Sequence, residues 1–575
     1  MNDPVGLVGS PSTTAKATVD ILENATGSPL HGSLVYLTHP MLDKTLIAIG
    51  TVTEIETANR WHEDPNMRGV LKKHGSLPHL SAVGDVRTAE VLVQAAYLAE
   101  APDPSIGEPP VEAGGALTMS PTTGAAVAPV SDEFLTQLLR RHVGEITYLG
   151  RIYKSNVRLP LTLRHFGPAD EGGAGEAYHS GIFGMTGSGK SALATYVIAA
   201  QLTHPQLSIL VMDPQGQFTS EEGLPFSLQE WAESRGRVVR TYGIANDLRL
   251  RQDAGLLADL LEPTRLLRDI LTIKGEENRA SAVAELARIL RGLTGWDDRP
   301  ADDVLRDALS NLVNDQLALQ RIYSSTTSQA RLVGAINSLL TSTTEFEIAA
   351  EFFRPLHSLF APTNRSGNRR TSIFTVFEEA LSTSGPRPLV IIDFSGGAGG
   401  GLLETTSVKA RILREVCSIL NLRAEQLFQK GGRMNALVVF DEAQRFAAEA
   451  AEEDETKLLA DRLVDYVRTT RKYGLGWMFI TQEISSLRRA IYAQLRVRAF
   501  GYGLTAGTEL QRLRETISDP AALDLYRSFV DPAAIRPSEY PFMLTGPVSP
   551  LSFTGAPVFL SVYTSFDEAK LANGW

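Results

Sequence analysis

The chain has 575 residues, of which 43% are hydrophobic and 21% are charged, a composition typical of a soluble globular protein with several structural units. Its formal net charge of -11 excludes non-specific coating of nucleic acid by charge alone, but it does not exclude a basic channel inside an acidic shell. The single cysteine, Cys417, excludes an internal disulfide framework. A mean hydropathy of -0.06 without a long apolar run predicts a cytoplasmic protein with no membrane association.

The N-terminal part of the chain is predicted to be a small β domain. Short runs of alternating apolar residues between 30 and 98 indicate strands, and the domain is expected to cover residues 30–165. Residues 1–29 are expected to be an N-terminal extension. The stretch 101–130 is rich in Pro, Gly, Ala and Thr, which predicts a mobile insert.

The central region alternates apolar runs with helical periodicity, which is typical of a parallel sheet with crossover helices. We therefore expect an α/β core in two parts, residues 166–224 and 381–534. Residues 225–380 are mostly helical by period and are predicted to be a helical insertion. Residues 535–575 are expected to form a tail rich in strands, which contacts the core or a neighbouring subunit.

A phosphate-binding loop is the strongest signal in the sequence. The stretch GMTGSGKS matches the pattern G-x-x-x-x-G-K-[ST], with an apolar strand before it and a helical period after it. Lys190 is expected to reach the β- and γ-phosphates, and Ser191 to ligate Mg²⁺. The nucleotide-binding residues predicted from this motif are Gly184, Met185, Thr186, Gly187, Ser188, Gly189, Lys190, Ser191 and Ala192.

A pair of carboxylates follows the apolar run LVVF far downstream. We expect Asp441 to hold the Mg²⁺ shell and Glu442 to orient or deprotonate an attacking water, a role that suits hydrolysis rather than binding alone. Together with the phosphate loop, this pair predicts an ATPase. Gln482, at the end of the strand GWMFITQ, is expected to sense the γ-phosphate or position the water, and its alternative is a strand-end amide that bonds backbone.

Three further polar residues have two open interpretations. Asp213 ends the strand LSILVMD before a turn, so a structural role and a functional one are equally compatible with the sequence. Arg468 and Arg471 lie near the end of a predicted helix, where basic residues are ordinary. Their alternative role is as an arginine finger that reaches the γ-phosphate of a neighbouring subunit.

The motifs, taken in order, resemble those of HerA, a hexameric DNA-translocating ATPase of the FtsK–HerA group. The stretches that carry the resemblance are HSGIFGMTGSGKS, MDPQGQF, VIIDFSG, LVVFDEAQRF and RTTRKYGLGWMFITQ. The resemblance implies a RecA-like P-loop ATPase core with an N-terminal β-barrel and a helical-bundle insertion. Gln215 and Gln444 stand where many relatives have histidine, which puts a relay role at these two positions in doubt.

The resemblance also implies partners. A homohexameric ring would bind ATP with Mg²⁺ at its subunit interfaces and duplex DNA in its central pore. A separate nuclease, or a sirtuin-like or nuclease effector of an antiphage defence system, would dock on the N-terminal barrel. The implied function is an ATP-driven duplex-DNA translocase, of helicase type, in DNA repair or defence.

Two alternatives remain open at this point. In the first, the protein is a ring that binds ATP in order to assemble and activate an effector, without an obligatory movement of DNA. The basic residues that are candidates for DNA contact are more simply explained as a solvated surface. They are Arg140, Arg141, Arg151, Lys154, Arg158, Arg164, Arg365, Arg369 and Arg370.

Overall fold

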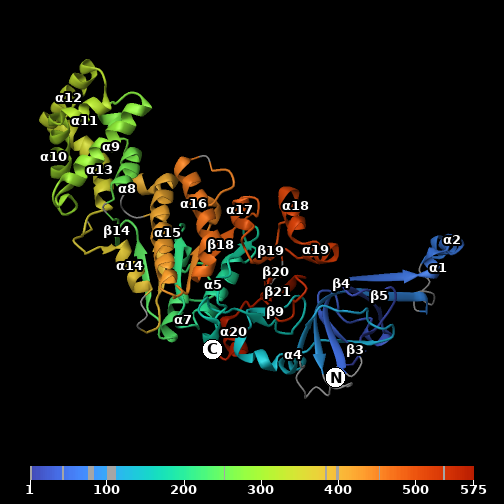
Figure 1. The fold of residues 1–575 in the computed structure, drawn as a ribbon. Helices are drawn as coiled ribbons and strands as arrows, with labels where there is room; N and C mark the ends of the chain where they lie inside the picture. The colour runs from blue at the N-terminus through green and yellow to red at the C-terminus, as the bar shows by residue number, and fades with distance from the viewer. Residues whose placement is uncertain are drawn as a thin grey trace.

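The computed structural model describes residues 3–41, 44–75, 83–99, 112–251, 253–364, 366–381, 385–396, 401–451, 453–534 and 538–575. An N-terminal barrel and a helical bundle lie on opposite sides of a central α/β core (Figure 1). Within the described ranges, no helix is both long and apolar enough to cross a lipid bilayer.

Six antiparallel strands form a closed barrel in the order β2, β1, β7, β3, β4 and β5, and pairing of β2 with β5 completes the circle. Alternate side chains, such as Val35 and Leu37 of β3, fill its interior. A short strand, β6, adds to β5 outside the circle. The strands are β1 (Gly6–Val8), β2 (Lys16–Ile21), β3 (Leu34–Met41), β4 (Lys44–Asn59), β5 (Asp85–Ala99), β6 (Glu112–Gly115) and β7 (Ala126–Pro129).

Two expectations about the barrel are wrong. Residues 1–29 are not a separate extension, because they supply β1 and β2, and Ala17 and Val19 of β2 are buried in the barrel. The expected mobile insert at 101–130 supplies β7, which pairs with both β1 and β3. Its residues 101–111 lie outside the described part of the chain. The strands β1 and β7 are short and poor in large apolar residues, so the alternation of apolar and polar residues that indicates a strand is weak in both.

The β4–β5 hairpin extends beyond the barrel as an arm, which we define as residues 57–75 and 83–87 (Figure 1). Its tip carries α1 (Arg60–Glu63) and α2 (Pro65–His74), neither of which contains a buried residue. Trp61 is 48% exposed, and Val70 is 42% exposed. The arm therefore presents apolar side chains to solvent.

The core sheet has ten strands in the order β13, β16, β12, β17, β18, β11, β19, β20, β21 and β9. The strands from β13 to β19 run parallel, and β20, β21 and β9 continue the sheet antiparallel. Their bounds are β9 (Gly150–Ile152), β11 (Ser180–Phe183), β12 (Ser208–Asp213), β13 (Val239–Gly243), β16 (Leu389–Asp393), β17 (Ala436–Phe440), β18 (Leu475–Thr481), β19 (Val497–Gly501), β20 (Tyr540–Thr545) and β21 (Val558–Val562).

Helices cover both faces of this sheet, which explains why its central strands are apolar throughout. On β12, Ile209 and Val211 belong to the core that includes α5 and α7, whereas Leu210 and Met212 belong to the core that includes α15 and α16. These helices are α5 (Lys190–Gln201), α7 (Leu228–Ser234), α15 (Thr406–Gln429) and α16 (Asp454–Thr470). The parallel strands thus end along one edge, where α/β proteins place their ligands.

The helical bundle projects from this core, as the sequence predicted, but it is shorter than expected (Figure 1). Its helices are α8 (Ala254–Leu261), α9 (Glu276–Gly292), α10 (Ala301–Asn314), α11 (Gln316–Ile322), α12 (Thr326–Thr341) and α13 (Thr343–Ser358). The boundaries expected at 225 and 380 are wrong. After residue 225, α7 packs with α5 and β13 pairs with β16 in the core sheet, so both belong to the core. Before residue 380, α14 (Ile373–Ala380) also meets the core, because Ser208 Oγ of β12 donates to Ala380 O at 2.8 Å.

The C-terminal residues complete the core. Phe566 of α20 (Phe566–Asn573) stacks on Phe226 with ring centroids 3.6 Å apart. The side chain of Asn573 accepts from Tyr148 N at 2.7 Å and donates to Tyr148 O at 2.8 Å. The expected β-barrel-like range therefore ends too late, because β9 pairs with β21 in the core sheet rather than with the barrel.

Candidate nucleotide-binding site

The phosphate-loop motif connects β11 to the start of α5, at the edge where the parallel strands end. Gly187 and Gly189 have φ angles of 84° and 88°, values that favour glycine. A Cβ on Gly189 would lie 2.5 Å from Cδ1 of Tyr540, so the loop is also too close to β20 for a side chain there. The first N–H groups of α5 have no partner within the helix, and they form a cradle for phosphate.

Lys190 and Ser191 occupy the first turn of α5. Lys190 Nζ donates to Met185 O at 3.0 Å, and Ser191 Oγ donates to Gln217 Oε1 at 3.0 Å. Burial lowers the pKa of Lys190, while the carboxylates of Glu442 and Asp441 act in the opposite direction. The structure thus brings the lysine of the phosphate loop together with the downstream acidic pair.

Asp441 follows directly after β17 and is 3% exposed. Its Oδ2 is buried and has no hydrogen-bond partner among the described residues. Burial, together with the charges of Glu442 and Asp213, raises the pKa of Asp441 to about 7. A buried carboxylate oxygen without a donor, in a site that also holds the Ser191 hydroxyl, fits a hard divalent cation such as Mg²⁺.

Gln482 connects the acidic pair to the phosphate loop. Its Nε2 donates to the two carboxylate oxygens of Glu442 at 3.4 and 3.5 Å, and its Oε1 accepts from Thr186 Oγ1 at 3.3 Å. Gln444 Nε2 also donates to Glu442. The backbone of Glu442 has a φ of 46°, an unusual value for a glutamate, so this residue is held by its surroundings.

Asp213 has a structural role in this arrangement. It is fully buried, and its carboxylate accepts from the backbone N–H groups of Gly216, Gln217 and Thr219 at 2.8, 3.0 and 2.8 Å. It therefore fixes the turn that carries Gln217. Gln215 is exposed in the same turn.

Arg468 and Arg471 lie away from the phosphate loop. Both are exposed, and Arg471 Nε pairs with Glu176 Oε2 at 3.2 Å. They precede β18, whereas Gln482 follows it. The seven residues of that strand separate the two ends by about 20 Å, so neither arginine reaches the phosphate loop of its own chain.

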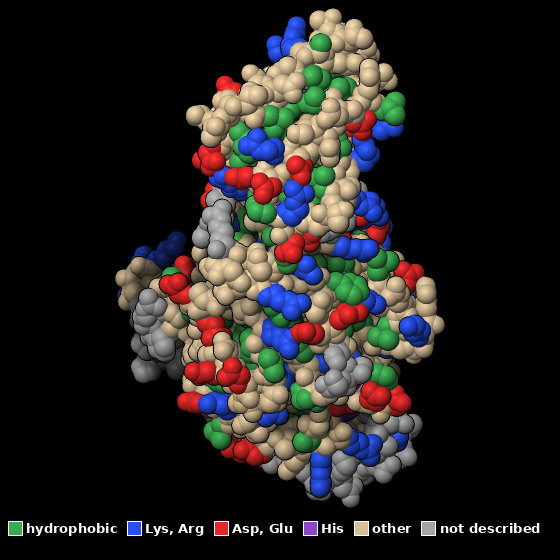
Figure 2. Space-filling model, turned by 90° about the vertical axis from the view of Figure 1, so that its left-hand side faces the viewer, with side chains coloured by type: hydrophobic (Ala, Val, Ile, Leu, Met, Phe, Trp, Pro, Cys, Tyr) green, Lys and Arg blue, Asp and Glu red, His purple; other side chains and the backbone are tan. Residues whose placement is uncertain are grey.

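The basic residues considered for DNA contact are largely engaged elsewhere. Arg151, Arg158 and Arg164 pair with Glu568, Asp132 and Glu145. Arg370 is 2% exposed and donates to Ile244 O and Ala245 O, so it is not a surface contact, and Arg365 lies outside the described residues. On the face drawn in Figure 2, basic and acidic side chains are interspersed over the described residues, without a broad basic track.

Two residues of the site were not anticipated from the sequence. Gln217 contacts Ser191, and its position two residues after Gln215 in the DPQGQF stretch was the only available signal. Glu509, on α18 (Gly507–Thr516), accepts from Ile484 N at 2.6 Å and from Ser485 N at 3.0 Å, two and three residues after Gln482. No sequence pattern connects Glu509 with the strand end that it holds.

The family model "Helicase HerA, central domain" matches residues 177–416. Among solved structures, VirB4 of Thermoanaerobacter pseudethanolicus is 14% identical, with a TM-score of 0.38 over 73% of this chain and 97% of VirB4. The unbound bacterial conjugative coupling protein TrwBdeltaN70 is 13% identical, with a TM-score of 0.37 over 76% of this chain and 92% of that one.

The genome packaging NTPase B204 of Sulfolobus turreted icosahedral virus 2 is 10% identical, with a TM-score of 0.27 over 67% of this chain and 96% of that one. No curated protein matches the chain. The family match includes the phosphate loop and extends through β16 into α15. The resemblance inferred from the motifs is confirmed over residues 177–416, where the chain matches the family model of the HerA central domain.

Proposed function

We propose that this protein hydrolyses ATP to move duplex DNA through the centre of a homohexameric ring. The observation that carries the proposal is the convergence of Lys190, Asp441, Glu442 and Gln482 on one sheet edge, in a chain with a HerA central domain. Lys190 and the N–H groups of residues 184–192 bind the triphosphate. Glu442, oriented by Gln482 and Gln444, accepts a proton from the attacking water.

Ser191 and Asp441 would hold the Mg²⁺ that accompanies ATP. When bound, the cation neutralises charge on the phosphate oxygens. The carboxylates of Glu442 and Asp441 favour the protonated ammonium of Lys190 in this partly desolvated site.

We further propose that a nuclease or defence effector docks on the N-terminal barrel, in the cytoplasm. The arm is the best candidate for the contact, because Trp61, Val70 and Val86 are exposed there without packing partners in the barrel core. Val86 is 55% exposed. Exposed aromatic and aliphatic groups on a projecting element are typical of a protein-binding surface.

The proposal is tested by measuring ATP hydrolysis by the full chain across a titration of linear duplex DNA. We expect turnover to rise with DNA and saturate, because a motor couples its cycle to its track. Lys190→Ala is the control that abolishes turnover at every DNA concentration. Turnover that depends on Lys190 but is indifferent to DNA would contradict translocation and favour a ring that assembles an effector.

Glu509 is expected to be a positioning residue for Gln482. The Glu509→Ala variant should lose both backbone contacts, and we expect kcat for ATP to fall about tenfold to a hundredfold, because small displacements of a positioned group are costly. KM should change less than twofold, since Glu509 contacts no residue of the phosphate loop among its described hydrogen bonds.

Glu509→Gln keeps one acceptor oxygen, and it should recover part of the lost kcat. Glu515→Ala is the matched control on the same helix, where the glutamate is exposed and pairs only at the surface with Arg489 and Arg512. Equal losses in Glu509→Ala and Glu515→Ala, or an increase in KM without a decrease in kcat, would show that Glu509 does not position Gln482.

A further inference from the structure

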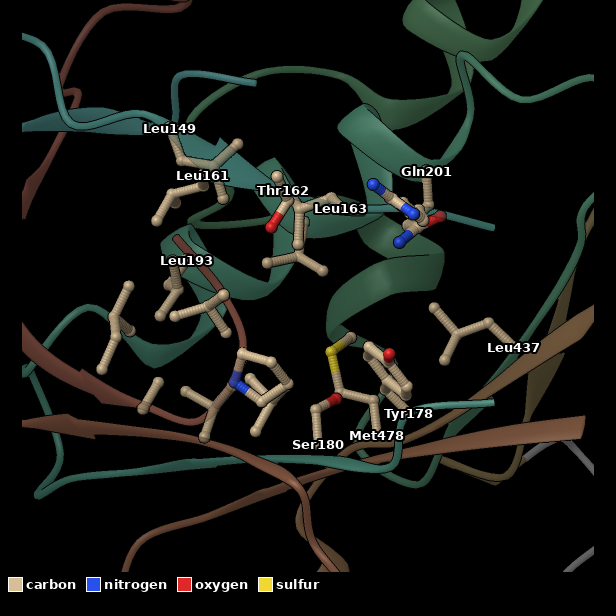
Figure 3. Close-up of a pocket in the computed structure, with 18 of the residues that line it drawn as sticks. Leu149, Leu161, Thr162, Leu163, Tyr178, Ser180, Leu193, Gln201, Leu437 and Met478 are labelled. Carbon is tan, nitrogen blue, oxygen red and sulfur yellow. The ribbon is translucent and has the colours of Figure 1, made fainter. Parts of the chain in front are cut away.

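A cavity of about 90 Å³ lies between α5, the core sheet and the segment 149–166 that joins the barrel to the core (Figure 3). Its walls are mostly apolar: α5 contributes Leu193 and Val197, the sheet contributes Met478, and the joining segment contributes Leu161. Figure 3 shows Leu161 and Leu163 on one side of the space and Met478 on the other. Neither the nucleotide nor the acidic pair of the proposed ATPase uses this cavity.

One polar group in the wall has an unmet hydrogen bond. Gln201, the last residue of α5, lines the cavity and is 4% exposed. Its Oε1 is buried and has no hydrogen-bond partner among the described residues. An acceptor left in this state is unfavourable, so a donor inside the cavity would be bound preferentially.

The cavity offers no free charge to a ligand. Arg164 is the single charged residue in its described lining, and its guanidinium is 2.5 Å from Glu145 Oε2. An anionic ligand would have to compete with this carboxylate, and a cationic one would find no acidic side chain in the lining. Electrostatics therefore favour a neutral ligand.

Small side chains keep the space open. Ser180 and Ala499 stand in the sheet wall, at positions where a larger side chain would enter the cavity. A concave apolar space at the junction of structural units, with few polar groups, has the typical composition of a small-molecule site.

We propose that this cavity binds a neutral molecule with an aromatic or short alkyl body and one O–H or N–H group that donates to Gln201. The apolar body replaces contacts that the cavity walls otherwise lack, and the donor satisfies the acceptor at the end of α5. The site is independent of ATP hydrolysis.

The test uses 4-fluorophenol and fluorobenzene, a pair that differs in one hydroxyl group, followed by ¹⁹F NMR on the full-length protein. We expect saturable binding of both, with 4-fluorophenol about threefold to tenfold tighter, which is the contribution of one neutral hydrogen bond. Absence of saturable binding of 4-fluorophenol, or equal affinities for the two probes, would overturn the proposal.

Two variants locate the binding. Val197→Phe fills the space and should abolish binding of both probes, while Gln201→Met keeps the size of the side chain and should make the two affinities equal. Gln229→Met, the same exchange at an exposed position of α7, is the control and should behave as wild type. Circular dichroism confirms that each variant is folded, and tight 4-fluorophenol binding in folded Val197→Phe or Gln201→Met would overturn the assignment.

Discussion

Replacing Glu442 with Gln is expected to lower kcat for ATP hydrolysis by about 10² to 10⁴ and to leave ATP binding intact. Glutamine has nearly the same shape, and its one carbonyl oxygen, in the place of Oε2, still accepts from Gln444 and Gln482, whereas the bond to Oε1 is lost. It has no basic oxygen to take a proton from water. The exchange also removes one negative charge near Lys190, so the Kd for ATP should be unchanged or lower.

The measurement is single-turnover hydrolysis combined with equilibrium binding of a fluorescent ATP analogue. Glu515→Gln provides the matched control, because that glutamate is exposed on α18 and should tolerate the exchange without effect. Turnover like that of wild type in Glu442→Gln would remove Glu442 from the mechanism. A loss of ATP binding together with turnover would indicate a structural role instead.

Mixed rings are expected to show that an arginine acts between subunits. Arg468 and Arg471 are separated from their own phosphate loop by a strand about 20 Å long, so we expect either one to contribute only to a neighbour's site. An arginine finger accounts for about 10³ to 10⁵ in rate. When Arg471→Ala or Arg468→Ala subunits are mixed with wild-type subunits, ATP turnover should therefore fall more than in proportion to the fraction of variant subunits. This steeper fall is expected only in the series of the arginine that acts in trans.

Each arginine is titrated in its own series, with the total protein concentration held constant. Arg514→Ala, which removes an exposed arginine of α18, is the control and should leave turnover unchanged at all ratios. Glu176→Gln adds a second readout, because it frees the Arg471 guanidinium from its ion pair without removing it. Strictly proportional losses in both arginine series would contradict action in trans.

Much of the core was predictable because its signals are local. The phosphate loop has a fixed spacing, and the strands that end at Asp213, Asp393 and Phe440 are apolar runs buried on both faces. β19, which lies between β11 and β20, gives a weaker signal, because the charged Arg498 interrupts its short apolar run.

The site was predictable in its residues but not in its contacts. Lys190 and the acidic pair follow from motif and strand position, and the structure brings them together. That Gln482 bridges Thr186 and Glu442, or that Gln444 donates to Glu442, depends on side-chain directions at three loops. Glu509 contacts backbone N–H groups, which any residue provides, so no sequence pattern could have indicated it.

The contact between Tyr148 and Asn573 joins positions 425 residues apart. In the same way, β9 cannot pair in the core sheet until β21 has been synthesised. At roughly 5 to 20 residues per second, a ribosome needs about 20 to 85 seconds to make the intervening chain. During that interval the faces of α5 and α7 that Phe566 later covers are open to water. We therefore expect newly made chains to be prone to associate before synthesis ends, and slower elongation or added chaperone to change the yield of folded protein.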